Sequence, residues 1–204
     1  MNRWKTTRMG RILSVMTVIV LLLSAVSCAG KETVPETSEE QETNNGKVIV
    51  VYFSHTGNTE KLAEYIAERT SADSYRIEAK DPYTDEDTRY DADTRAYREQ
   101  HDSDCRPEIA GKLPDLNGYD VIFLGYPIWH GEAPKIVYTF LDNVDVSGKR
   151  IIPFCTSASS PVGMSAKNLE SLKPEADWDE GIRLEIESTA EDIEAWLNTL
   201  GLAD

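Results

Sequence analysis

Apolar residues form three short and almost uninterrupted runs along the chain, at residues 47–53, 121–126 and 149–155. Continuous runs that are rich in Val, Ile and Phe are typical of parallel strands buried on both faces. Residues 74–79 alternate between polar and apolar side chains, as a shorter strand does. Together with residues 181–187, which we interpret as the last strand, the pattern predicts five strands.

Apolar residues at helical spacing separate these strands. The first predicted helix buries one apolar face, formed by Leu62, Ala63, Ile66 and Ala67. A charged, weakly amphipathic helix is expected at about 86–101, a third helix carries Pro134 in its first turn, and a fourth covers about 165–172. Ser188, with Glu191 three residues later, predicts a capping box that opens the last helix.

Strands that alternate with helices predict βαβ units, and therefore an α/β fold with a doubly wound parallel sheet and helices on both faces. Pro153 lies inside the predicted strand at 149–155, where its missing N–H removes one ladder hydrogen bond. Ligands of such sheets bind beyond the carboxyl ends of the strands. This rule directs attention to three loops, at residues 54–59, 126–134 and 155–165.

The first loop joins a buried strand directly to a helix and is almost entirely polar. Its members are Ser54, His55, Thr56, Gly57, Asn58 and Thr59. A helix N-terminus exposes unpaired N–H groups and a partial positive charge, so it binds a phosphate without a lysine. An ordinary helix cap would explain one polar residue rather than six. The loop therefore predicts a phosphate site, although it follows neither the GxxxxGK[ST] nor the GxGxxG pattern.

The stretch SHTGNT resembles the phosphate loop of the flavodoxin family, whose pattern is (S/T)-x-T-G-x-T. The later segments DPYTDED, RPEIAGKLPDLNGYDVIFLGYPIWHGEAPKIVYTFLD and IIPFCTS resemble that family in the same order, and the similarity covers essentially all of 47–204. The resemblance implies a flavodoxin-like fold with FMN as the cofactor. It also implies that the second and third loops flank the isoalloxazine ring.

This resemblance assigns cofactor contacts to both of those loops. The second loop contributes Tyr126, Pro127, Ile128, Trp129, His130 and Gly131. The third contributes Thr156, Ser157, Ala158, Ser159 and Gly163. We expect Trp129 to cover the ring, the alternative being a core or lid residue, and His130 to lie either beside the ring or at the surface. Relatives often have glycines in place of Ala158 and Ser159, so these side chains are expected to stiffen the loop and crowd the flavin.

The first 27 residues differ in composition from the rest of the chain. Four basic residues precede an apolar run at 12–26, which is shorter than the roughly 20 residues that a spanning helix needs. We interpret residues 1–27 as a signal peptide. It ends in SAVSC, which resembles a bacterial lipoprotein signal with Cys28 as the lipidated residue. A general secretory signal with an incidental cysteine is the alternative.

The acidic, Glu/Thr/Asn-rich residues 28–46 predict a flexible tether, and residues 47–204 predict one folded domain. The expected location is therefore extracytoplasmic, on a bacterial membrane to which the lipid holds the chain. Ala29 after Cys28 favours the outer membrane or the cell surface.

Without the signal, the chain carries 17 basic and 36 acidic residues, a net charge of −19. Nucleic acid and anionic lipid surfaces are therefore poor partners for the chain, and we expect no nucleic-acid binding. The acidic surface either only solubilises the protein or docks a basic redox partner. Cys105 and Cys155 show no spacing typical of a metal site, and a disulfide between them is chemically allowed outside the cytoplasm.

These observations predict an FMN-binding electron-transfer protein. An electron carrier needs no catalytic acid or base, so no catalytic residue is assigned. Its electron source is open: a redox partner protein or an NAD(P)H system. Two alternatives remain, an NAD(P)H-dependent quinone or flavin reductase on the same fold, and a lipoprotein that has lost FMN and acts as a binding module.

Overall fold

The computed structural model describes residues 46–202. The predicted signal peptide, Cys28 and all of the predicted tether except Gly46 lie outside the described residues. Within the described range, no helix is long and apolar enough to cross a membrane.

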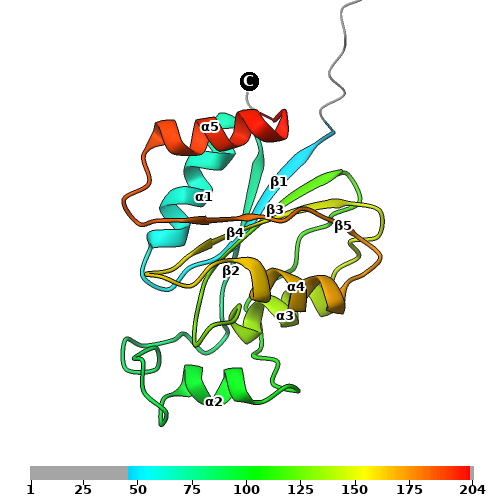
Figure 1. Cartoon of the computed structure of the whole chain (residues 1–204). Coiled ribbons are helices and arrows are strands. Elements are labelled where there is room, and N and C mark those ends of the chain that lie inside the picture. The colour runs from blue at the N-terminus through cyan, green and yellow to red at the C-terminus, as the bar shows by residue number, and fades with distance from the viewer. Residues whose placement is uncertain (1–45, 203–204) are drawn as a thin grey trace, which may run out of the picture. The chain divides into compact units, whose positions relative to one another are not determined.

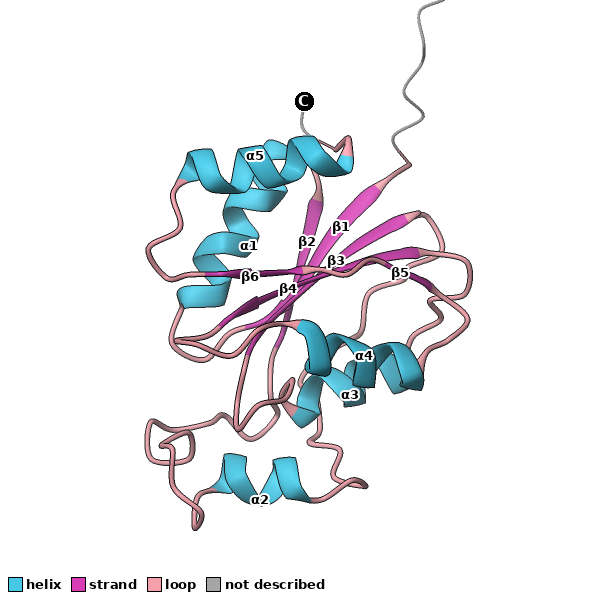
Figure 2. Cartoon of the chain, viewed as in Figure 1, coloured by secondary structure: helices cyan, strands magenta, loops and turns pink. Residues whose placement is uncertain are grey.

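The centre of the fold is a parallel sheet with the strand order β2-β1-β3-β4-β5, in which β6 also pairs with β4 (Figure 2). The strands are β1 (Val48–Phe53), β2 (Asp73–Ile77), β3 (Val121–Pro127), β4 (Arg150–Thr156), β5 (Asp177–Trp178) and β6 (Ile182–Leu184). The order reverses between β1 and β3, which makes their carboxyl ends the switch point of the sheet. The predicted doubly wound α/β fold is confirmed.

Helices cover both faces of this sheet, α1 (Asn58–Arg69) and α5 (Ala190–Leu200) on one face and α3 (Lys135–Asp142) and α4 (Gly163–Leu172) on the other (Figure 1). The short helix α2 (Arg95–His101) lies apart from the sheet. Successive side chains of a strand point to opposite faces. Val50 of β1 therefore packs in the core beneath α1 and α5, whereas Val51 packs in the core beneath α3 and α4. Because β1, β3 and β4 are buried on both faces, their sequences are continuous apolar runs.

The fifth strand of the sheet is divided into β5 and β6, and Pro153 of β4 lies opposite the break. β5 pairs with Arg150 and Ile151, whereas β6 pairs with residues 154–156. Pro153 has no N–H to offer to a neighbouring strand. The chain passes it at Gly181, where φ is +73° and a Cβ atom would lie 2.4 Å from the carbonyl oxygen of Pro153. The strand predicted at 181–187 is therefore too long, because only residues 182–184 form β6. The short strand β5 at 177–178 was not predicted.

The prediction of a helix at about 86–101 is wrong for its first half, because the helix α2 begins only at Arg95. Asp87 accepts hydrogen bonds from the backbone N–H and the hydroxyl of Thr84, at 2.9 and 2.8 Å. These bonds hold a turn rather than a helix. Thr94 then caps α2 through its side chain. Segment 78–94 is thus an irregular excursion between β2 and α2.

The last helix begins one residue later than expected. Thr189 and Asp192 form the capping box, with the Asp192 amide 3.2 Å from Thr189 Oγ1 and the Thr189 amide 2.8 Å from Asp192 Oδ2. The predicted pair of Ser188 and Glu191 is wrong, because Ser188 Oγ accepts a hydrogen bond from the Glu185 amide and closes the preceding turn. In α3, similarly, Pro134 is the N-cap rather than a member of the first turn.

Candidate functional site

The three predicted loops lie together at the carboxyl edge of the sheet, and contacts join each loop to the others. The hydroxyl oxygens of Thr59 and Thr156 are 2.8 Å apart, which joins the first and third loops. The Ile128 amide donates to the Thr156 carbonyl oxygen at 2.9 Å, which joins the second and third. The rings of His55 and Trp129 meet edge to face with centroids 6.4 Å apart, which joins the first and second.

The start of α1 is open to an anion. Gly57 is the N-cap with φ +87°, and no side chain caps this helix. The first helical hydrogen bond runs from the Lys61 amide to the Gly57 carbonyl oxygen at 3.0 Å, so the preceding amides have no partner within the helix. A Cβ atom at Gly57 would meet nothing within 4 Å. Backbone donors and open space therefore coincide at this helix end, as phosphate binding requires.

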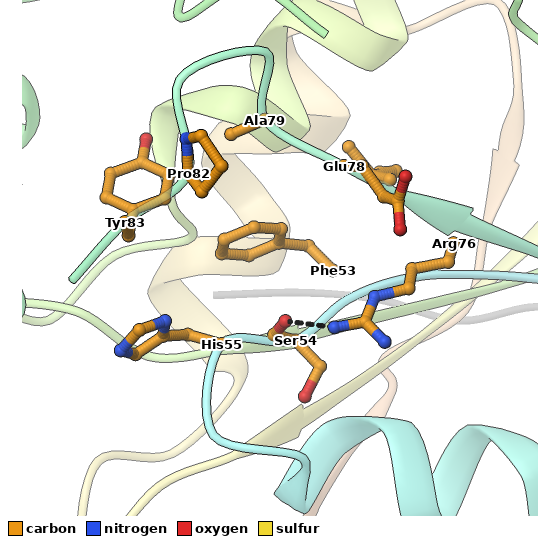
Figure 3. A pocket seen from close by; sticks show the side chains of 9 residues that line it. Phe53, Ser54, His55, Arg76, Glu78, Ala79, Pro82 and Tyr83 are labelled. Atoms are coloured by element: carbon orange, nitrogen blue, oxygen red, sulfur yellow. Dashed lines mark hydrogen bonds between the residues drawn. The ribbon is translucent and has the colours of Figure 1, made fainter. Parts of the chain in front are cut away.

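Ser54 offers a further hydrogen-bond donor near the start of α1. Its hydroxyl is buried and has no hydrogen-bond partner among the described residues. Figure 3 shows the hydroxyl turned toward the start of α1, whereas the carbonyl oxygen of the same residue is turned toward Arg76. Leaving a buried hydroxyl without a partner is unfavourable. The combination of an orphaned hydroxyl with an uncapped helix start fits a phosphate group.

Other side chains of the first loop are engaged with one another or with neighbouring segments. Thr56 is exposed and accepts a hydrogen bond from the Asn58 amide group at 3.2 Å. His55 is mostly buried, and its Nε2 lies 3.1 Å from a carboxylate oxygen of the exposed Asp85. The first loop is thus held in place by the irregular segment 78–94.

Arg76 of β2 supports the first loop from the neighbouring strand. Its guanidinium donates to the Ser54 carbonyl oxygen at 3.3 Å and forms an ion pair with Glu60 in the first turn of α1. Sequence reasoning missed both Arg76 and Asp85. Their partners are 22 and 30 residues away along the chain, and no local pattern marks such contacts.

Trp129 belongs to an aromatic cluster at the carboxyl end of β1. Its ring meets Phe53 and Tyr83 edge to face, with centroid distances of 5.4 and 4.9 Å. The Gln100 side chain of α2 donates to the Trp129 carbonyl oxygen at 3.1 Å. Trp129 is only partly buried, so the ring packs on the core and still borders the site.

The tip of the second loop is a two-residue turn at His130 and Gly131, where φ is +49° and +87°. The imidazole of His130 stacks on Tyr90 at 4.7 Å and meets Tyr97 edge to face at 5.2 Å. Burial, and then the nearby His101, lower the pKa of His130. His130 is therefore partly buried, with its ring packed against the exposed Tyr90 of segment 78–94.

The remaining predicted residues of the second loop differ in exposure. Tyr126 is completely buried, and its hydroxyl lies 3.1 Å from that of Ser165 in α4. Its ring is therefore part of the core. Pro127 and Ile128 are partly buried, and Gly131 is exposed.

The third loop is held at its start and exposed at its tip. The Ser157 hydroxyl donates to the Ser160 carbonyl oxygen, and the guanidinium of Arg183 donates to the Ser157 carbonyl oxygen at 3.2 Å. Ala158 and Ser159 are exposed, and Gly163 opens α4.

The two described cysteines are both free thiols. Cys155 is completely buried beneath the third loop, and burial raises the pKa of its thiol to about 12. Cys105 is partly buried, and burial raises the pKa of its thiol as well. Among residues 46–202, no group of three or more His, Cys, Asp or Glu side chains is arranged to hold a metal ion.

A cavity of about 380 Å³ adjoins the first loop at the carboxyl ends of β1 and β2 (Figure 3). Its lining residues come from the end of β1, the end of β2 and segment 78–83. It shares Ser54 and His55 with the first loop, but it is lined by neither the second nor the third loop. The cavity is therefore not the place where the three loops meet.

Comparisons with known proteins agree with this geometry. A family model described as flavodoxin matches residues 47–200. A curated flavodoxin from Maridesulfovibrio salexigens is 30% identical over 115 residues, which are 53% of this chain and 61% of that protein. The chain thus matches less than two thirds of that curated relative.

Solved structures share the fold over a larger fraction of their length. Candidate flavoproteins from Bacteroides eggerthii and Bacteroides uniformis are both 37% identical with a TM-score of 0.72, over 77% and 76% of this chain and 99% of theirs. A flavoprotein from Lactobacillus acidophilus, solved in complex with FMN, is 22% identical with a TM-score of 0.54, over 74% of this chain and 98% of that chain.

Proposed function

Because this chain belongs to the flavodoxin family, we propose that it binds FMN at the carboxyl edge of its sheet and serves as an electron-transfer protein. The observation that carries the proposal is the start of α1, where an uncapped helix end meets the buried, unpartnered hydroxyl of Ser54. Both features lack partners among the described residues, and both match the needs of a phosphate monoester.

FMN supplies the redox chemistry, because it exchanges one or two electrons. The chain holds the cofactor and sets its surroundings. The backbone amides at the start of α1 and the hydroxyl of Ser54 hold the phosphate, and Gly57 leaves room for it. Trp129 and the third loop border the region assigned to the ring.

A lipid anchor at Cys28 is the second part of the proposal. It is supported by the sequence alone, namely the basic start, the apolar run at 12–26 and the small residues before Cys28. The acidic residues 28–46 would then link the lipid to the domain. In this arrangement the protein works outside the cytoplasm, on the outer membrane or the cell surface.

The cofactor assignment is tested by purifying the full chain and measuring its visible absorption. A flavin spectrum is expected, and the chromophore released by denaturation should be FMN. Protein without bound flavin is then titrated with FMN and followed by quenching of flavin fluorescence. A chain that neither contains nor takes up FMN contradicts the proposal and supports a binding module on the same fold.

Two further measurements address the role and the location. Holoprotein that does not oxidise NADH or NADPH in the steady state supports a carrier, whereas rapid oxidation supports a reductase. Cys28→Ala is expected to move the protein from the membrane fraction to the soluble fraction. Unchanged membrane association of Cys28→Ala contradicts the lipid anchor and leaves the FMN assignment intact.

A further inference from the structure

Thr156 contacts or adjoins all three loops of the site. Its hydroxyl oxygen lies 2.8 Å from Thr59 Oγ1 in the first loop. Its carbonyl oxygen accepts a hydrogen bond from the Ile128 amide of the second loop at 2.9 Å. Thr156 is also the last residue of β4 and itself belongs to the start of the third loop.

The hydrogen bond between the two threonines is shielded from water. Thr59 is 1% exposed and Thr156 is 5% exposed. Phe154 and Tyr52 pack in the core beneath α1. Thr156 and Ser54 each follow one of these residues by two positions, so they lie on the same face of the sheet. The pair therefore lies beside the open start of α1 rather than at the exposed tip of the third loop.

A threonine hydroxyl donates one hydrogen bond and accepts up to two. If Thr156 donates to Thr59, the proton of Thr59 is free to bond another acceptor. If Thr59 donates instead, its proton is used. The hydroxyl of Thr59 is thus available to an anion at the start of α1 only in the first arrangement. A chain of hydrogen bonds that ends on an anion also strengthens each of its members.

We propose that Thr156 is a positioning residue for the phosphate of FMN. Its hydroxyl donates to Thr59 Oγ1, and Thr59 in turn donates to the phosphate. The inference rests on the proposed function, since it concerns the same cofactor. It departs from the sequence prediction, in which Thr156 contacts the flavin ring. Thr156 therefore affects phosphate binding only through Thr59, and it does not affect a flavin that lacks a phosphate.

The test compares FMN with riboflavin, which carries the same ring and no phosphate. Both flavins are titrated into the flavin-free full chain and into its Thr156→Val, Thr156→Ser, Thr59→Val and doubly substituted variants. Thr156→Val is expected to weaken FMN binding by about tenfold, as the loss of one buried hydrogen bond does. Riboflavin binding should stay within about twofold of wild type, and Thr156→Ser should restore FMN binding.

The double variant tests whether Thr156 acts through Thr59. In the Thr59→Val background, adding Thr156→Val is expected to cause no further loss of FMN affinity, because the residue it orients is gone. Thr139→Val is the matched control. It removes a partly buried hydroxyl that donates to the Lys135 carbonyl oxygen within α3, and it should leave both flavin affinities unchanged.

Several outcomes would overturn the inference. Equal weakening of FMN and riboflavin by Thr156→Val would indicate a ring contact or a general structural role. Additive losses in the double variant would show that the two threonines act independently, and unchanged FMN affinity would exclude any role. Wild-type protein that binds neither flavin would refute the proposed function itself, whereas the preceding outcomes refute only the role of Thr156.

Discussion

Ser54 is the residue whose proposed role in phosphate binding has a cost for the stability of the flavin-free chain. Its hydroxyl is buried without a partner among the described residues, and such an orphaned group costs about 1–3 kcal/mol of folding free energy. The buried Ser165 of α4 differs, because its hydroxyl bonds to both Tyr126 and the Val162 carbonyl oxygen. A bound phosphate would accept the hydrogen bond that the Ser54 hydroxyl lacks in the flavin-free chain.

We therefore predict opposite effects of Ser54→Ala on stability and on binding. The free energy of unfolding of the flavin-free protein should rise by about 1 kcal/mol, because the unpaired hydroxyl is removed. FMN affinity should fall by about tenfold or more, because a hydrogen bond to a charged group is lost. Urea denaturation and flavin titration measure the two quantities. Ser165→Ala is the control and should destabilise the protein; a destabilised Ser54→Ala would contradict the prediction.

The two cysteines are expected to differ in reactivity. Burial raises the pKa of the Cys155 thiol to about 12, and the thiolate is the reactive form. At pH 7.5 iodoacetamide should therefore modify the partly buried Cys105 of the native protein and leave Cys155 unmodified, as read by peptide mass mapping. Denaturant should expose both. Modification of native Cys155 at the rate of Cys105 would show that the core beneath the third loop opens readily.

Individual site residues were predictable from the sequence when the signal was local. Ser54, Gly57 and Thr59 follow one another in a single motif, so their common site could be read directly. Arg76 and Asp85 were not predictable, because their contacts with the first loop depend on how the sheet and segment 78–94 are placed.

At the scale of elements, the packing of β3 against β4 leaves no space at Gly125. A Cβ atom there would lie 2.2 Å from the ring of Phe154, which is completely buried. The ring therefore occupies the volume that any larger residue would need. The two strands pair in register at these positions, so the glycine follows from sheet packing.

Gly125→Ala is expected to lower the free energy of unfolding by about 1–3 kcal/mol, since an added methyl group forces the core to shift. Gly118→Ala, in the loop before β3, should have little effect because a Cβ atom there meets nothing within 4 Å. Chemical denaturation of both variants measures the difference. Equal stability of the two would show that Phe154 moves aside easily.

The capping box of α5 gives a second prediction at this scale. Thr189→Ala should destabilise the protein by about 1 kcal/mol, as the loss of an N-cap does, and Ser188→Ala should have a smaller effect. Hydrogen bonds from the Thr189 amide and hydroxyl lower the pKa of Asp192. A lowered pKa in the folded state means that ionised Asp192 stabilises the fold. This stabilisation is present above the ordinary pKa of Asp and is lost as the pH falls from there through the lowered pKa.

Thermal unfolding of wild type and Asp192→Asn between pH 7 and pH 3 measures that contribution. The difference in melting temperature should narrow toward pH 3. A difference that is constant over this range would show that the charge of Asp192 does not stabilise the helix.

Helices and strands were predicted well where the sequence showed a single pattern. They were predicted poorly where adjacent residues offered two patterns of equal quality. The buried runs of β1, β3 and β4 left no alternative to strands. The pairs Ser188/Glu191 and Thr189/Asp192 have the same spacing, and the choice between them depends on how α5 packs through Ile193 and Leu197. The break between β5 and β6 depends on Pro153, which belongs to another strand.

For the whole molecule, charge is the property that the sequence determines most directly. The chain without its predicted signal has a net charge of −19. A field of this sign raises the local concentration of cations and lowers that of anions, and salt screens it. Electron exchange with small charged reagents should therefore depend on their sign.

We expect reduction of the FMN-loaded protein by a cationic viologen radical to slow several-fold as ionic strength rises from about 0.02 to 0.5 M. Reduction by an anionic reductant should become faster over the same range. Stopped-flow absorbance in the flavin band measures both rates. The same salt dependence for the two reagents would show that the net charge does not act at the site.

The direction of β1 bears on which redox partners could reach the proposed FMN site. Its first residue, Val48, lies just after the proposed tether, and its last residue, Phe53, precedes the first loop. The two ends of the strand are therefore about 17 Å apart. If residues 28–46 hang from a lipid, their fully extended length is at most about 65 Å. A freely diffusing electron acceptor would then reach the proposed FMN site directly. A quinone within the bilayer would reach it only after the domain rotated on its tether.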